Sequence, residues 1–245
     1  MFSRGNISEK IRFGKLVCEG ELVLDMYAGI GYYTLPALVH GKAKHVCACE
    51  WNEHAAAALR YNLSQNGVSD RATVFVGDCR ESFRENEALK IGFDRISLGL
   101  LPSSEGGWRT AVQALNYETG GWLHVHGNVP TLEREKWGSW VCQRLLKLRD
   151  DCGGDPVRAH VVLCQHIERV KSFAPKIEHF VADIFLGSVY RLSHDLPHIS
   201  MKGHRCGIIQ QSGGFLPVPL GSVDEPSCAL GKGILDQKWM MSDED

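Results

Sequence analysis

The fold is decided by one stretch near the start of the chain, Leu22-Val23-Leu24-Asp25-Met26-Tyr27-Ala28-Gly29-Ile30-Gly31. It begins with a short apolar run that ends in an acid, which is typical of a buried strand. The closely spaced glycines indicate a tight turn, and a helix is expected over about Tyr32 to Val39, ended by Gly41. Because glycine has no Cβ, the backbone of this turn can approach a ligand closely. The stretch therefore predicts a strand, turn and helix whose turn faces a bound molecule.

Short apolar runs and helical stretches continue to alternate after this unit. Further strands are expected at 45–50, 72–76, 93–98, 122–126, 160–166 and 177–185, and helices after Asn52, at 105–116 and at 133–148. Asn52 is expected to cap its helix, which Asn66-Gly67 ends. Strands that alternate with helices through right-handed crossovers form a parallel sheet covered on both faces. The predicted fold class is α/β, with a doubly wound, mainly parallel sheet.

Three features should meet at the carboxyl ends of the strands, where open α/β sheets bind ligands. They are the glycine turn, Glu50 at the end of the second strand, and Gly77-Asp78-Cys79 after the third. Glu50 is placed to accept hydrogen bonds from both hydroxyls of a ribose, and Asp78 to read an adenine edge. A nicotinamide dinucleotide would require GxGxxG, but Thr34 occupies the third glycine position. The acids favour S-adenosylmethionine over a dinucleotide or an empty turn.

Composition excludes several other classes of protein. The 245 residues are 44% hydrophobic and 23% charged, as in an ordinary globular protein. No apolar run of about 18 residues predicts a membrane span, and no signal peptide is visible. The nine cysteines form no paired CxxC units, so we expect no metal site and a cytoplasmic protein with reduced thiols. His124 and His126 are expected to be core or edge residues rather than members of a catalytic triad.

The net charge of −2 bears on nucleic-acid binding. A protein that grips RNA alone usually carries a basic patch, because phosphate neutralisation dominates affinity. Positive charge is enriched here only locally, at Arg4, Lys10, Arg12 and Lys15 and at Arg144, Lys147 and Arg149. Solvated helix faces explain both clusters. If RNA is the substrate, much of the binding affinity is expected to come from residues outside these two clusters.

Five stretches together form a specific pattern: Met1-Phe2-Ser3-Arg4-Gly5-Asn6-Ile7-Ser8-Glu9-Lys10-Ile11-Arg12, Asp25-Met26-Tyr27-Ala28-Gly29-Ile30-Gly31-Tyr32, Cys49-Glu50-Trp51-Asn52, Leu100-Leu101-Pro102-Ser103-Ser104-Glu105 and Val170-Lys171-Ser172-Phe173-Ala174-Pro175. In them the chain resembles the tRNA wybutosine-synthesizing protein 2 family over about residues 1 to 186. That family is related in fold to the tRNA guanosine-37 N1-methyltransferases. The resemblance implies a Rossmann-like class I S-adenosylmethionine-dependent methyltransferase fold.

The resemblance also implies a reaction. S-adenosylmethionine would donate its 3-amino-3-carboxypropyl group to C7 of 4-demethylwyosine at position 37 of tRNA(Phe), in wybutosine biosynthesis, with methylthioadenosine as by-product. A sulfonium activates all three attached carbons, so the geometry of the site selects the transferred group. The methyltransferase relatives typically carry an Asn-Leu-Pro or Asn-Pro-Pro segment after the fourth strand. Leu100 replaces the polar residue here, which favours aminocarboxypropyl transfer over methylation.

Site residues follow from the same resemblance, position by position. The residues assigned to the donor are Ser3, Lys10, Glu50, Asp78 and Cys79. Those assigned to the target-base side are Pro102, Ser103 and Ser104. No general base is identified, since an electron-rich base needs little beyond alignment.

Three segments are expected: a donor-binding N-terminal segment at 1–20, an S-adenosylmethionine-binding catalytic domain at 21–186, and an irregular or disordered tail at 187–245. The tail is rich in Gly, Pro and Ser, and a small structured module is the alternative. Family members carry tRNA-holding sequence before the catalytic domain, and this chain begins at its edge. Two other functions stay open: a guanosine-37 methyltransferase, and a truncated form that binds the donor without catalysis.

Overall fold

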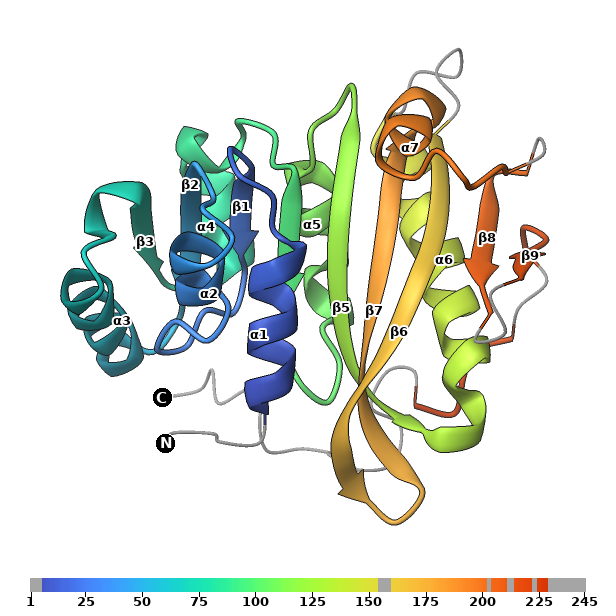
Figure 1. The fold of residues 1–245 in the computed structure, drawn as a ribbon, viewed down its shortest axis with the longest axis horizontal. Helices are drawn as coiled ribbons and strands as arrows, with labels where there is room; N and C mark the ends of the chain where they lie inside the picture. Colours follow the sequence, from blue (N-terminus) through green and yellow to red (C-terminus); the bar gives the residue numbers. More distant parts are fainter. Residues whose placement is uncertain (1–5, 154–159, 202–203, 211–213, 222–223, 229–245) are drawn as a thin grey trace, which may run out of the picture.

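The computed structural model describes residues 6–153, 160–201, 204–210, 214–221 and 224–228. They form a sheet with the strand order β3-β2-β1-β4-β5-β7-β6-β8-β9 (Figure 1). The strands are β1 Leu22–Asp25, β2 His45–Glu50, β3 Ala72–Val76, β4 Arg95–Leu98, β5 Gly120–Pro130, β6 His160–Ala174, β7 Ile177–Ser188, β8 Cys206–Ile209 and β9 Phe215–Pro217. The first five are parallel, and β7 runs antiparallel between β5 and β6. The predicted doubly wound, mainly parallel α/β fold is confirmed.

Helices cover both faces of this sheet (Figure 1). On one face lie α1 Ile7–Leu16, α2 Thr34–Val39 and α3 Glu53–Gln65, and on the other α4 Cys79–Glu85, α5 Trp108–Ala114 and α6 Arg134–Asp151. Each layer encloses its own hydrophobic core, with Phe13 buried under α1 and Trp108 packed on Trp140 on the opposite side. Among the described helices, none has the length and apolar character needed to cross a membrane.

A local signal sets the start of α3. Asn52 caps α3 as predicted, since its side chain accepts from the amides of His54 at 2.9 Å and Ala55 at 3.1 Å. The helices α1 and α4 were not expected, because polar residues interrupt their apolar faces. Strands β5, β6 and β7 are longer than predicted: an antiparallel ladder continues them through polar residues that no apolar alternation marks.

The predicted irregular tail is wrong for part of 187–245. Helix α7 Val189–Asp195 buries Leu192 against the sheet, and β8 pairs in parallel with β6. Strand β9 then pairs with β8. Such short strands show no sequence periodicity, and the open edge of β6 supplies the pairing that orders them. The small structured module, the alternative for this region, describes 189–217 better; residues 229–245 lie outside the described part of the chain.

Candidate functional site

The glycine turn after β1 is braced by a buried carboxylate. Asp25 Oδ2 accepts from Thr34 N at 3.1 Å and from Thr34 Oγ1 at 2.7 Å, and its side chain has no exposed surface. Burial raises the pKa of Asp25 to about 6, against the hydrogen bonds from Thr34 that favour the carboxylate. Gly29 and Gly31 both have positive φ, which other residues rarely adopt. Asp25 therefore closes the turn rather than facing a ligand.

Glu50 joins the turn to the end of β2. Its carboxylate accepts from Gly29 N at 2.7 Å and from Asn52 N at 2.8 Å, while its own carbonyl accepts from Gly77 N at 3.0 Å. The ends of β1, β2 and β3 thus meet at Glu50, whose carboxylate accepts from the turn after β1 and whose backbone carbonyl accepts from Gly77, the residue before Asp78. A carboxylate offers about four acceptor positions. The two backbone amides leave acceptor positions free for a diol.

The segment after β3 lies directly beside Glu50. Asp78 caps α4 by accepting from Arg80 N at 2.7 Å, and the Arg80 guanidinium lowers the pKa of its carboxyl. Cys79 is 6% exposed, and burial raises the pKa of its thiol to about 11. The thiol is therefore neutral near pH 7. It can pack against a ligand but is not poised as a nucleophile.

Lys10 reaches the glycine turn from α1. Its Nζ lies 4.4 Å from the centre of the Tyr32 ring, within cation–π range. Both residues line a cleft of about 350 Å³ between α1, the glycine turn and α2. Burial lowers the pKa of Lys10. The structure thus brings Lys10 to the turn, whereas Ser3 lies outside the described residues.

The predicted target-base residues follow β4, next to β5. Pro102 O accepts from Asn128 N at 2.9 Å, and Ser103 pairs with Gly127. The Ser103 hydroxyl also accepts from Glu105 N at 3.2 Å. Ser104 is fully buried, and its hydroxyl accepts from Trp108 Nε1 at 3.0 Å. Ser104 therefore anchors α5 in this conformation, and the partly exposed Pro102 and Ser103 remain the candidates for base contact.

Two aromatic residues near the donor residues were not predicted as part of the site. Trp51 directly follows Glu50 and is 71% exposed, an unusual position for so large an apolar side chain. Tyr27 lies in the glycine turn, partly buried and beside Cys79. In the sequence, the signal for Trp51 was its position directly after Glu50, the acid expected to bind a ribose.

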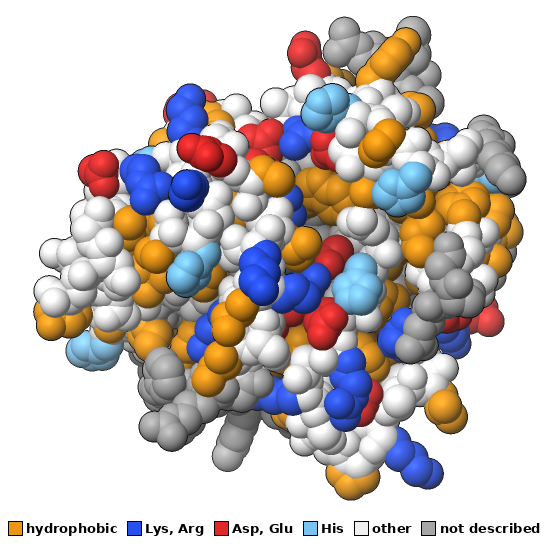
Figure 2. All heavy atoms as spheres, in the orientation of Figure 1, with side chains coloured by type: hydrophobic (Ala, Val, Ile, Leu, Met, Phe, Trp, Pro, Cys, Tyr) orange, Lys and Arg blue, Asp and Glu red, His pale blue; other side chains and the backbone are white. Residues whose placement is uncertain are grey.

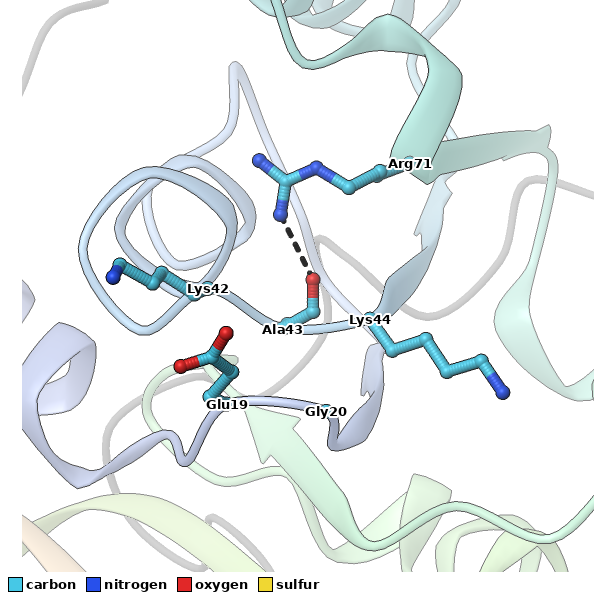
Figure 3. A pocket seen from close by; sticks show the side chains of 6 residues that line it. All are labelled: Glu19, Gly20, Lys42, Ala43, Lys44 and Arg71. Atoms are coloured by element: carbon cyan, nitrogen blue, oxygen red, sulfur yellow. Dashed lines mark hydrogen bonds between the residues drawn. The ribbon is translucent and has the colours of Figure 1, made fainter.

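A second hollow, of about 500 Å³, lies at the amino ends of the strands, opposite the glycine turn (Figure 3). Its residues precede β1, β2 and β3, and Arg71 donates to Ala43 O at 2.9 Å and to Leu38 O at 3.1 Å. The Arg71 side chain reaches toward the Ala43 carbonyl and ties the loops together. This hollow is remote from the glycine turn, because parallel strands separate their amino and carboxyl ends.

A buried polar network holds α1 on the sheet. Its members are Glu9, Arg12, Glu21, Arg95, His124 and Asp183. Arg95 Nη1 donates to His124 Nε2 at 2.8 Å, so His124 carries its proton on Nδ1 and donates it to Asp183 Oδ1 at 2.6 Å. Burial lowers the pKa of His124 despite Asp183, which keeps the imidazole neutral. Asp183 also accepts from Arg12 on α1.

A neighbouring histidine pair makes stability depend on pH. His126 Nδ1 lies 2.9 Å from His179 Nε2, and both imidazoles are buried. Burial, and then the charge of Lys171, lower the pKa of His179 to about 4. An unfolded imidazole binds a proton at about pH 6.5, so the fold loses stability as pH falls from 6.5 toward 4.

Acidification from pH 7 to pH 5 is therefore expected to lower the free energy of unfolding by about 2 kcal/mol through His179 alone. Urea unfolding at a series of pH values measures the effect. In His179→Gln, which has no proton to gain, the decrease should shrink by that amount even though the variant is less stable at pH 7. Equal pH dependence in both proteins would show that His179 does not titrate as its burial implies.

Known proteins are similar to this chain in sequence. The family model described as the TRM5/TYW2 methyltransferase domain matches residues 1–137. The chain is 50% identical over 184 residues to tRNA wybutosine-synthesizing protein 2/3/4 of Arabidopsis thaliana, covering 75% of this chain and 18% of that protein. It is 41% identical over 213 residues to the tRNA wybutosine-synthesizing protein 2 homolog of Danio rerio, covering 75% and 50%. The chain spans half or less of the length of these relatives.

Solved structures of TYW2 proteins have a fold similar to that of this chain. The M. jannaschii TYW2 structure in complex with AdoMet aligns with a TM-score of 0.64 at 26% identity, covering 77% of this chain and 78% of that one. P. horikoshii TYW2 in complex with MeSAdo aligns with a TM-score of 0.64 at 28% identity, covering 76% and 64%. Because the family model spans more than half of the sequence, the chain belongs to the TRM5/TYW2 methyltransferase-domain family.

Proposed function

We propose that this chain binds S-adenosylmethionine at the carboxyl ends of β1, β2 and β3. Glu50 accepts from the ribose hydroxyls, and Asp78 and Cys79 lie along the adenine, with the exposed Trp51 ring beside them. Lys10, with Ser3, serves the polar end of the donor. The observation that supports this placement is a pair of hydrogen bonds to the Glu50 carboxylate. Gly29 N donates at 2.7 Å and Asn52 N at 2.8 Å, and together they orient the carboxylate toward the turn.

The proposed reaction is transfer of the 3-amino-3-carboxypropyl group to C7 of 4-demethylwyosine at position 37 of tRNA(Phe). A C–C bond forms at C7 as the C–S bond breaks; sulfur keeps the electron pair in methylthioadenosine, and C7 loses its proton to water. The relatives named tRNA wybutosine-synthesizing protein 2 support this activity. So does Leu100, which is 42% exposed and offers no polar group where the methyltransferase relatives carry one.

The chain's residues contribute orientation more than acid–base chemistry in this proposal. The Pro102 carbonyl, held by Asn128 N, and the neighbouring Ser103 shape the base-binding side. Holding the base atom in line with the breaking bond lowers the activation free energy, because the reacting atoms are already positioned when the substrate binds. The nine unpaired thiols suit a reducing cytoplasmic setting.

The by-product identifies the reaction. Incubation with S-adenosylmethionine and hypomodified tRNA(Phe) is expected to release methylthioadenosine, measured by mass spectrometry. S-adenosylhomocysteine in its place would establish the guanosine-37 methyltransferase alternative. Donor binding with no turnover would support the form that binds without catalysis, and an added upstream RNA-binding segment should then restore activity.

A further inference from the structure

The β6–β7 hairpin projects beyond the rest of the sheet at the end where β5 terminates (Figure 1). Pro130, the last residue of β5, pairs with Ile177 at the start of β7. Ala174 pairs with the same Ile177, so the hairpin turn at Pro175 and Lys176 extends past the carboxyl end of β5, with Lys171 to Ala174 alongside its last residues. Residues 171–176 at the end of this hairpin contribute to none of the three hydrophobic clusters, although their sequence is in one of the stretches that mark the family.

A continuous row of residues links the hairpin to the base-binding side. Pro102 O accepts from Asn128 N at 2.9 Å, Asn128 pairs with His179, and His179 pairs with Lys171. Neighbouring strands lie about 4.8 Å apart, so Lys171 is two strand spacings, about 10 Å, from Asn128. Paired residues project from the same face of a sheet. Lys171 thus lies level with the Pro102 loop and on the same face as His179, about 15 Å from the loop across β7 and β5.

The surface of the hairpin end combines an exposed aromatic ring with positive charge. Phe173 is 51% exposed, and the stretch from Val170 to Lys176 carries two lysines and no acid. Arg169 and Glu178, nearer the sheet, neutralise each other in an ion pair. Figure 2 shows Lys and Arg side chains together with hydrophobic ones at this lower end of the molecule. The remaining charge at the end is positive.

We propose that Lys171, Phe173 and Lys176 form an RNA-contacting surface that binds unpaired nucleotides next to the modified base. This inference rests on the proposed function, because it takes tRNA as the substrate. An exposed ring flanked by cations suits single-stranded RNA: a base stacks on the ring while ammonium groups contact phosphates. A paired helix offers no free base face to Phe173, so the partner is the loop that carries the target nucleotide.

Photo-crosslinking tests the contact without requiring turnover. The photoreactive residue p-benzoylphenylalanine is placed at position 173, and, as a matched control, at Tyr190. Tyr190 is 90% exposed on α7, about 40 Å away at the other end of β7. With tRNA(Phe), position 173 is expected to crosslink to the anticodon loop and position 190 to give no specific product. Equal crosslinking at both positions, or capture of the stem alone by 173, would overturn the proposal.

Binding measurements give an independent test. Phe173→Ala is expected to weaken tRNA binding about tenfold, the effect of losing one stacked base. Lys171→Ala combined with Lys176→Ala should reduce the slope of log affinity against log salt by about 1.4, for two single-strand phosphate contacts. Donor affinity should stay unchanged in both. Lys42→Ala combined with Lys44→Ala, at the opposite hollow, is the matched control.

Unchanged tRNA affinity in both hairpin variants would exclude the hairpin as an RNA surface and leave protein association as its use. That failure is distinct from failure of the proposed function. The unsubstituted chain would still release methylthioadenosine if only the hairpin proposal were wrong. It would release none, while position 173 still crosslinked to the loop, if only the reaction were wrong.

Discussion

Glu50→Ala is expected to weaken S-adenosylmethionine binding by about a hundredfold, as measured by titration calorimetry. The Glu50 carboxylate already accepts from Gly29 N and Asn52 N, and in the proposed donor placement its remaining acceptor positions serve the ribose hydroxyls. Hydrogen bonds to an ionised acceptor are the strong ones, so their loss is costly. Alanine also leaves the Gly29 and Asn52 amides without their acceptor. The glycine turn is then no longer held in its binding conformation, and the proposed contact of Glu50 with the ribose is lost as well.

Two variants separate these contributions. Glu50→Gln keeps one acceptor oxygen but turns an NH₂ group toward a backbone amide, so an intermediate loss is expected. Glu53→Ala, an exposed acid in the first turn of α3, is the matched control and should bind normally. If Glu50→Ala melts normally and its donor affinity stays within about twofold, the ribose binds elsewhere and the proposed donor placement is wrong.

The strands that build the site were the most predictable part of the fold. In β1 and β2, buried on both faces, all residues except the strand-terminal Asp25, His45 and Glu50 are apolar, so hydrophobicity marks them. Glu50 stood out because it ends such a strand. The long hairpin of β6 and β7 was predicted too short, because beyond His166 the large apolar residues Ile167, Val170 and Phe173 recur three positions apart and do not alternate as strand residues usually do.

Side-chain roles within the site were harder to predict, because they depend on which neighbour a group reaches. Asp25 and Glu50 both end strands, yet Asp25 turns inward to Thr34 while Glu50 faces the turn. Ser103 and Ser104 are adjacent in sequence, and only Ser104 is sealed beneath Trp108. The network through Asp183 joins residues 171 positions apart in the chain. No local pattern encodes such a contact.

That network leads to the second large effect. Asp183→Ala is expected to lower the free energy of unfolding by about 3 kcal/mol, since removing one partner leaves buried charge and donors unpaired. Asp183 is 3% exposed and accepts from both His124 and Arg12. Although burial opposes ionisation, His124 and Arg12 hold the pKa of Asp183 below its ordinary range. Its contribution is therefore complete above about pH 4 and is lost only as the pH falls further.

Urea unfolding of Asp183→Ala and Glu178→Ala compares two carboxylates on one strand. Each pairs with an arginine, but the Glu178 pair lies at the surface, where solvent screens it, so little change is expected there. Asp183→Asn should fall between the two, because its amide oxygen still accepts from His124. Equal stabilities for the two alanine variants would mean that Arg12 finds a sufficient partner in Glu9, 2.7 Å from its Nε. In that case α1, which places Lys10 at the cleft beside the glycine turn, would be held by its apolar contacts, chiefly through the buried ring of Phe13.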